Sequence, residues 1–198
     1  MLRKDIFENN YIYHVYNRGV DKRNVFRDKA DYERFIFSLD RFNLSERVTN
    51  TYRRLDQQIN SEMAPPLIHV HAYCLMPNHY HLIIEQLVDG GISKFLQKVM
   101  TGYTMYFNKR YEKSGVIFQG RTKSKLVNDD NYLRWLKDYL ALNPLDLCEN
   151  GWKEKGITNE NKAREFLQNY KWRSNYDYST ADFRNFLKDL KEGNFRPF

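Results

Sequence analysis

The chain has 198 residues, 41% of them hydrophobic, which is enough for one packed domain with appended segments. Its two cysteines exclude a disulfide framework, and the lack of a signal peptide or of any long apolar run favours a soluble cytoplasmic protein without a membrane anchor. A net charge of +7 from 32 basic and 25 acidic residues, with 16% aromatic residues, suits the binding of single-stranded nucleic acid.

The N-terminal third predicts one strand, one helix and a long connection. Residues Tyr11–Arg18 are aromatic and β-branched and precede a glycine, as is typical of a strand. Asp28 can cap a helix whose apolar positions run from Tyr32 to Phe42 at helical spacing. The polar residues 45–66 end in Pro-Pro and form a variable connection.

The middle of the chain predicts a hairpin and a helix. Strands Leu67–Met76 and His79–Leu87 are joined by Pro77–Asn78, a dipeptide common in turns. Two glycines then precede a helix over Ile92–Tyr111, whose apolar residues recur every three or four positions.

The remaining elements are a fourth strand, a third long helix and a tail. The strand lies within Val116–Val127, and Asp129 and Asp130 cap a helix that ends before Pro144. In the tail we expect helices around Asn161–Gln168 and Thr180–Lys191. This order predicts a ferredoxin-like, RRM-like α+β sandwich, in which helices cover one face of an antiparallel sheet of four to five strands. Residues 1–145 would form the main domain, and residues 146–198 a helical tail packed on it.

Two histidine pairs have the spacing of metal ligands on a strand. His79 and His81 project from one face about 7 Å apart and can bind one divalent ion. His69 and His71 have the same spacing on the preceding strand. A regular hairpin with a two-residue turn places that pair on the opposite face, so only one pair is expected to bind metal, and the pattern alone does not choose between them.

A possible nucleophile lies on the third long helix. Tyr139 and Asn143 are four residues apart, so they share one helical face and could offer a phenol and an amide oxygen to the same ion. The alternative is that Tyr139 packs in the core between Leu136 and Leu140. Pro144 also disfavours helical geometry at Asn143.

These residues occur in segments that resemble a known family. The stretch Leu75–Ile84 (LMPNHYHLII) is similar to the core motif of single-tyrosine HUH transposases, especially the REP-associated tyrosine transposases. Three further segments match in the same order, and a fourth in the tail is similar except at Arg173 and Asn175: His14–Gly19, Gly115–Arg121, Asp138–Pro144 and Tyr170–Tyr176. The resemblance covers roughly residues 11–178, apart from the 45–66 connection.

The resemblance implies a specific chemistry. His79, His81 and Asn143 would bind Mg²⁺ or Mn²⁺, and Tyr139 would attack single-stranded DNA beside a hairpin to give a 5′-phosphotyrosine link. Residues 1–145 would then be the catalytic domain of a transposase that acts as a monomer or homodimer. His69 and His71 do not match the family's ligand positions, and we interpret them as structural.

Several polar residues are candidates for DNA contact. Arg121, Lys123 and Lys125 alternate along the fourth strand, so we expect all three on one face, gripping phosphates. The alternative is an edge strand that lysines protect from aggregation. Arg18 and Gln119, at strand ends, are lesser candidates.

Three other functions are compatible with part of this pattern. A non-catalytic RNA- or single-strand-binding module would use the same sheet with exposed aromatic residues. A rolling-circle replication initiator or relaxase would use the same active-site residues, but the chain is short for one. A small metallohydrolase would need a general base, and no acidic residue obviously pairs with the histidines.

Overall fold

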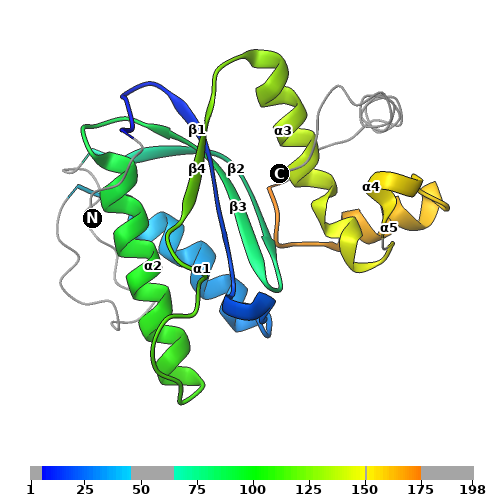
Figure 1. The fold of residues 1–198 in the computed structure, drawn as a ribbon, viewed down its shortest axis with the longest axis horizontal. Coiled ribbons are helices and arrows are strands. Elements are labelled where there is room, and N and C mark those ends of the chain that lie inside the picture. Colours follow the sequence, from blue (N-terminus) through cyan, green and yellow to red (C-terminus); the bar gives the residue numbers. More distant parts are fainter. Residues whose placement is uncertain (1–5, 46–64, 150, 175–198) are drawn as a thin grey trace. The chain divides into compact units, whose positions relative to one another are not determined.

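The computed structural model describes residues 6–45, 65–149 and 151–174. Its strands and helices in chain order, with two short 3-10 helices (η), are shown in Figure 1 and are β1 (Ile12–Arg18), η1 (Val20–Lys22), α1 (Lys29–Arg41), β2 (Ile68–Met76), β3 (His79–Gln86), α2 (Gly91–Arg110), β4 (Lys123–Val127), α3 (Asp130–Leu142), η2 (Asn143–Leu147), α4 (Trp152–Lys155) and α5 (Glu160–Asn169). No helix within these ranges is both long and apolar enough to cross a membrane.

The strands form a sheet in the order β2-β3-β1-β4, which confirms the expected ferredoxin-like α+β arrangement. Within the described ranges the sheet has four strands, the lower number of the expected range. β1 and β3 pair in antiparallel fashion, with Tyr16 opposite His81 and Arg18 opposite His79. Residues directly opposite each other project from the same face, so these four side chains share one side of the sheet.

The chain divides into two compact units. The first comprises residues 1–71 and 77–126, and the second comprises residues 72–76 and 127–198. The second half of β2 therefore belongs to the same unit as α3 and the tail. The expected boundary near residue 145 stays a prediction.

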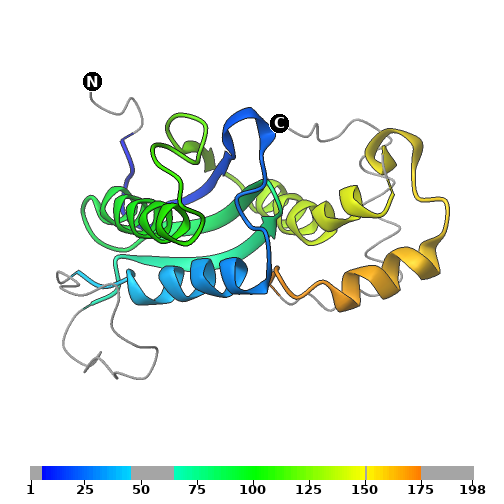
Figure 2. The same ribbon diagram turned by 90° about the horizontal axis from the view of Figure 1, so that it is seen from below.

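In the first unit, α1 and α2 pack on the face of the sheet that carries Tyr80. The Tyr80 ring lies 5.3 Å from that of Phe35 on α1, and its hydroxyl lies 3.3 Å from Sδ of Met100 on α2. Figure 2 shows α1 and α2 lying near each other beside the strands. The expectation of helices on one face is confirmed for α1 and α2.

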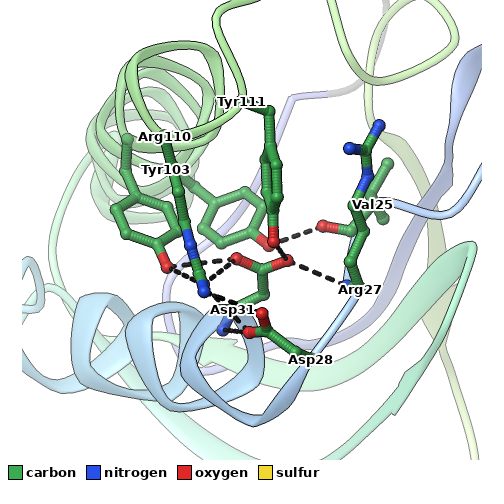
Figure 3. A network of polar contacts seen from close by, with 8 residues as sticks. Val25, Arg27, Asp28, Asp31, Tyr103, Arg110 and Tyr111 are labelled. Carbon is green, nitrogen blue, oxygen red and sulfur yellow. Dashed lines mark hydrogen bonds and ion pairs between the residues drawn. The ribbon is translucent and has the colours of Figure 1, made fainter.

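A buried carboxylate ties these two helices together (Figure 3). Asp31, near the start of α1, is 0% exposed and accepts a hydrogen bond from Nη1 of Arg110 at 2.8 Å. The hydroxyls of Tyr106 and Tyr111 also donate to it, at 3.0 and 2.8 Å. The backbone N–H of Arg27 supplies a fourth donor at 2.8 Å. Because both carboxylate oxygens are satisfied, the charge can remain buried where α1 meets the end of α2.

In the second unit, the tail adds a short extended segment to β2. The N–H of Leu75 donates to the carbonyl of Trp172 at 2.8 Å, and the N–H of Ser174 donates to the carbonyl of Tyr73 at 2.9 Å. The expected helix near residues 161–168 is confirmed as α5, whereas the one expected at 180–191 lies outside the described residues. The short helices η2 and α4 were not predicted from the sequence.

Candidate active site

His79 and His81 are brought together on β3 as the alternation predicted. Their ring centroids are 5.1 Å apart, and the ring planes are nearly perpendicular. His81 is buried, with 6% of its surface exposed, and His79 is half-buried. The pair therefore lies at the surface of the sheet face opposite α1 and α2.

The Nδ1 atoms of both histidines make hydrogen bonds. Nδ1 of His79 lies 2.6 Å from Oδ1 of Asn78, and Nδ1 of His81 lies 2.9 Å from Nε2 of His14. The Asn78 amide also donates from Nδ2 to the carbonyl of Lys22, at 3.3 Å, which orients Oδ1 toward His79. Nε2 is thus the nitrogen through which each ring would bind a cation.

This donor set fits a divalent metal ion. Two imidazoles on adjacent positions of one face can converge on one ion, and amide or phosphate oxygens can complete the coordination. Within the described residues, no group of three or more His, Cys, Asp or Glu side chains could hold a metal. Oxygen ligands such as phosphate or water would complete the coordination of a metal on His79 and His81.

His14 is a site residue that the sequence reasoning did not single out. It is fully buried on β1, and burial, reinforced by the charge of Lys125, lowers its pKa to about 3. The imidazole is therefore neutral at physiological pH. The sequence signal was present, because His14, Tyr16 and Arg18 alternate on one face, but only the β1–β3 pairing shows that His14 meets His81.

The second histidine pair forms a different contact. The rings of His69 and His71 are 4.6 Å apart, and Nε2 of His71 lies 2.9 Å from a carboxylate oxygen of Glu85. Alternation along β3 places Glu85 on the same face as His81. The expectation that His71 projects from the opposite face is therefore wrong, because a side chain on that face could not reach Glu85. Its acidic partner is consistent with a structural role.

Tyr139 lies on α3 and Asn143 directly follows the end of α3, one helical turn after Tyr139, in the second unit. The expectation that Pro144 would disfavour helical geometry at Asn143 is wrong, because Asn143 has φ −51° and ψ −36° and its N–H donates to the carbonyl of Tyr139. Pro144 instead lies at the start of η2, where a missing N–H is tolerated. The Tyr139 ring stacks on Trp135 at 5.5 Å, and both Tyr139 and Asn143 are buried.

A lysine lies beside the phenol. Nζ of Lys153 is 5.1 Å from the centre of the Tyr139 ring and 2.7 Å from a carboxylate oxygen of Asp146. Burial raises the pKa of Tyr139, and the charge and hydrogen bond of Lys153 oppose this effect. The sequence pattern did not indicate Lys153, because only tertiary structure places the short helix α4, on which it lies, near Tyr139.

Four of the proposed DNA-contacting residues surround the histidine face. Arg18 lies opposite His79, and its Nε donates to Oε1 of Gln119 at 2.5 Å. Nζ of Lys123 lies 6.0 Å from the Tyr16 ring. The charge of Lys125 acts on His14. All four of these polar side chains are exposed.

Arg121 occupies a different position from the one expected. It precedes β4, which begins only at Lys123, and lines a groove of about 960 Å³ with Asn17 and residues of α2. The strand expected within residues 116–127 is confirmed, but it begins after Arg121, because residues 117–119 pair beside the end of β1 and the following Gly120 has a positive φ of 64°. The stripe on β4 consists of Lys123 and Lys125 alone.

A family model described as "Transposase IS200 like" matches residues 8–143, which include both histidines, Tyr139 and Asn143. The chain belongs to the IS200-like transposase family. No curated protein matches the sequence.

A solved structure shares the transposase's fold. It is a REP-associated tyrosine transposase bound to a REP hairpin, and it is 15% identical to this chain. The match has a TM-score of 0.51 and covers 77% of this chain and 74% of the other. Family and fold agree with the resemblance seen in the sequence motifs, and they favour an enzyme of DNA cleavage and transfer over a non-catalytic RNA-binding module.

The transposase thus carries two groups of candidate site residues. The histidines, with Arg18, Lys123 and Lys125, belong to the first unit, and Tyr139, Asn143 and Lys153 belong to the second. The first group offers cation ligands beside a basic surface. The second offers a phenol beside an ammonium group.

Proposed function

We propose that this transposase cuts and rejoins single-stranded DNA at hairpin-flanked sites, with Tyr139 as the nucleophile. The observation that carries the proposal is the His79–His81 pair, whose Nδ1 atoms are both engaged so that both Nε2 atoms suit a divalent ion. The family match includes Tyr139 and Asn143 in the same segment. The active site would require the two groups of residues to meet, either within one chain or between two copies in a homodimer.

The chemistry is a transesterification. The phenol oxygen of Tyr139 attacks the scissile phosphorus and loses its proton, and the bond from phosphorus to the 3′ oxygen breaks. The products are a free 3′-hydroxyl and a 5′-phosphotyrosine link on the protein. Another 3′-hydroxyl can attack this link and release Tyr139, so strands are joined without an external energy source.

Mg²⁺ or Mn²⁺ would be held by His79, His81 and the Asn143 amide oxygen. When bound, such an ion polarises the phosphate and stabilises its developing negative charge. Lys153, beside Tyr139, would favour the phenolate in the same step.

The basic residues around the histidines would hold the DNA. Lys123 and Lys125 would bind phosphates, with Arg18, Gln119 and Arg121 as further contacts. The exposure of Lys123, Lys125, Arg18 and Gln119 around the histidine face supports this role, as does the net charge of +7. The hairpin is proposed by analogy with the solved REP-associated transposase, which is bound to one.

A covalent-adduct assay tests the proposal. The protein is incubated with labelled single-stranded hairpin DNA and Mn²⁺, and products are separated on a denaturing gel. We expect a slowly migrating covalent band in the wild type and none in Tyr139→Phe or with a chelator. Tyr132→Phe is the matched control, because Tyr132 lies on the same helix and should retain the band. Wild-type cleavage by Tyr139→Phe would refute the proposal.

A further inference from the structure

His14 lies in a buried position on β1 beside one of the two proposed ligands. Its side chain is 0% exposed, and its Nε2 lies 2.9 Å from Nδ1 of His81. The two ring planes are only 17° apart, so the contact joins the facing edges of the imidazoles. Tyr16 lies against both, with its ring centre 4.8 Å from that of His14 and 5.8 Å from that of His81. These contacts restrict the orientation of the His81 ring.

The hydrogen bond between two imidazoles needs one donor and one acceptor. If Nδ1 of His81 donates, Nε2 of His81 keeps its lone pair and can bind a cation. If Nε2 of His14 donates instead, neutral His81 carries its proton on Nε2, and that nitrogen cannot bind. The direction of this one hydrogen bond therefore decides whether His81 can act as a ligand.

The hydrogen bond of His79, the other proposed ligand, indicates which direction to expect for the His14–His81 hydrogen bond. Asn78 is oriented by its bond to the Lys22 carbonyl, so its Oδ1 accepts the Nδ1 proton of His79. Metal-binding histidines generally donate their second ring N–H to such a fixed acceptor, which sets the tautomer and the ring orientation. His14 would do for His81 what Asn78 does for His79.

We propose that His14 is a positioning residue that accepts the Nδ1 proton of His81 and directs Nε2 of His81 toward the divalent ion. The inference rests on the proposed function, because it requires His79 and His81 to bind that ion. In this arrangement His14 is neutral and carries its own proton on Nδ1. It contacts neither the ion nor the DNA.

Manganese binding without DNA tests the inference. The dissociation constant of Mn²⁺ is measured by electron paramagnetic resonance of the free ion for His14→Phe, His14→Gln and the control His69→Gln. Phe keeps a ring but removes the acceptor, and we expect it to weaken binding about 10- to 100-fold. The Gln amide can still accept the proton, so His14→Gln should bind much more tightly than His14→Phe. His69→Gln should match the wild type, and circular dichroism checks that each variant is folded.

A second measurement needs no His14 variant. Long-range nitrogen–proton NMR spectra of the wild type, assigned with His81→Gln, report which ring nitrogen of His81 carries the proton. We expect the proton on Nδ1 when Mg²⁺ is present. A proton on Nε2 of His81 under these conditions would overturn the inference even if His14→Phe does not fold.

Alanine variants of the ligands separate this inference from the proposed function. His79→Ala and His81→Ala should both lose Mn²⁺ affinity. Wild-type affinity in these two variants would reject the metal site itself, and the role of His14 with it. Lost affinity in these variants, together with wild-type affinity in a folded His14→Phe, would reject only the role of His14.

Discussion

The ring of Tyr139 contacts both an aromatic ring and an ammonium group. Trp135 stacks on one side, and Lys153 lies 5.1 Å from the ring centre. Burial raises the pKa of Tyr139, which disfavours the phenolate needed for attack, whereas Lys153 favours it. Lys153 should therefore stabilise the ionised form of the nucleophile.

Replacing Lys153 tests this balance. In Lys153→Met the pKa of Tyr139 should rise further, so the limb of the rate profile that depends on phenol ionisation should move to higher pH. At neutral pH the cleavage rate should fall, by about tenfold for each unit of that move. The measurement is adduct formation as a function of pH under single-turnover conditions.

Lys155→Met provides the control, because Lys155 is an exposed lysine on the same short helix. It should leave the profile unchanged. An identical profile in Lys153→Met would show that Lys153 only packs against the ring.

At the residue scale, local spacing in the sequence was enough to predict which candidate side chains lie together. His79 and His81 follow from alternation within one strand, and Tyr139 and Asn143 from one helical turn. His14 and Lys153 could not be identified in this way. His14 lies 67 residues from His81 along the chain, and only strand pairing brings the two together. Lys153 lies 14 residues from Tyr139, and only the packing of helices brings these two together.

At the scale of elements, the Asp31 cluster joins α1 to the end of α2. Four donors converge on one buried carboxylate, and two of them, Tyr106 and Arg110, come from α2. Because hydrogen bonds to a charged group are stronger than neutral ones, these four hydrogen bonds should stabilise the helix pair more than four neutral ones would.

Asp31→Asn should lower the free energy of unfolding by about 2–4 kcal/mol, because Asn loses the charge and cannot satisfy the donors in the same way. Asp40→Asn on the exposed side of α1 is the matched control and should change stability by less than about 0.5 kcal/mol. Urea unfolding followed by circular dichroism measures both. Equal stabilities of the two variants would contradict a stabilising role for the cluster.

Element boundaries were predictable where a side chain caps the helix. Asp28 and Asp129 each accept a hydrogen bond from the N–H three residues later, and α1 and α3 begin as expected. The fourth strand lies within residues 116–127 as predicted, but it begins only at Lys123, because residues 117–119 pair beside the end of β1 through distant backbone partners. At Pro144 the helix does not simply end but continues as η2.

At the scale of the molecule, charge should govern DNA binding. Lys123 and Lys125 are exposed on the histidine face of the sheet, and each would release about 0.7 counterion equivalents from single-stranded DNA. Lys123→Ala and Lys125→Ala should therefore weaken hairpin binding. Each should also reduce the steepness of the plot of log binding constant against log salt concentration by about 0.7.

Lys94→Ala is the control, because Lys94 is an exposed lysine on α2, which packs on the other face of the sheet. Fluorescence anisotropy across a series of salt concentrations measures all three variants with Tyr139→Phe as the background, so that cleavage does not interfere. An unchanged slope in Lys123→Ala and Lys125→Ala would remove these residues from the DNA-binding surface.

The ferredoxin-like order of elements was predictable from the whole sequence, but the division of β2 between two units was not. It depends on backbone hydrogen bonds between Tyr73 or Leu75 and residues about 100 positions later, which no local pattern specifies. The segment Trp172–Ser174 pairs with the backbone along one edge of β2. Without it, the unpaired N–H and C=O groups of that edge could pair with a strand of another molecule. Ser174→Pro, which lacks the N–H that Tyr73 receives, should therefore yield protein that self-associates and precipitates as its concentration rises.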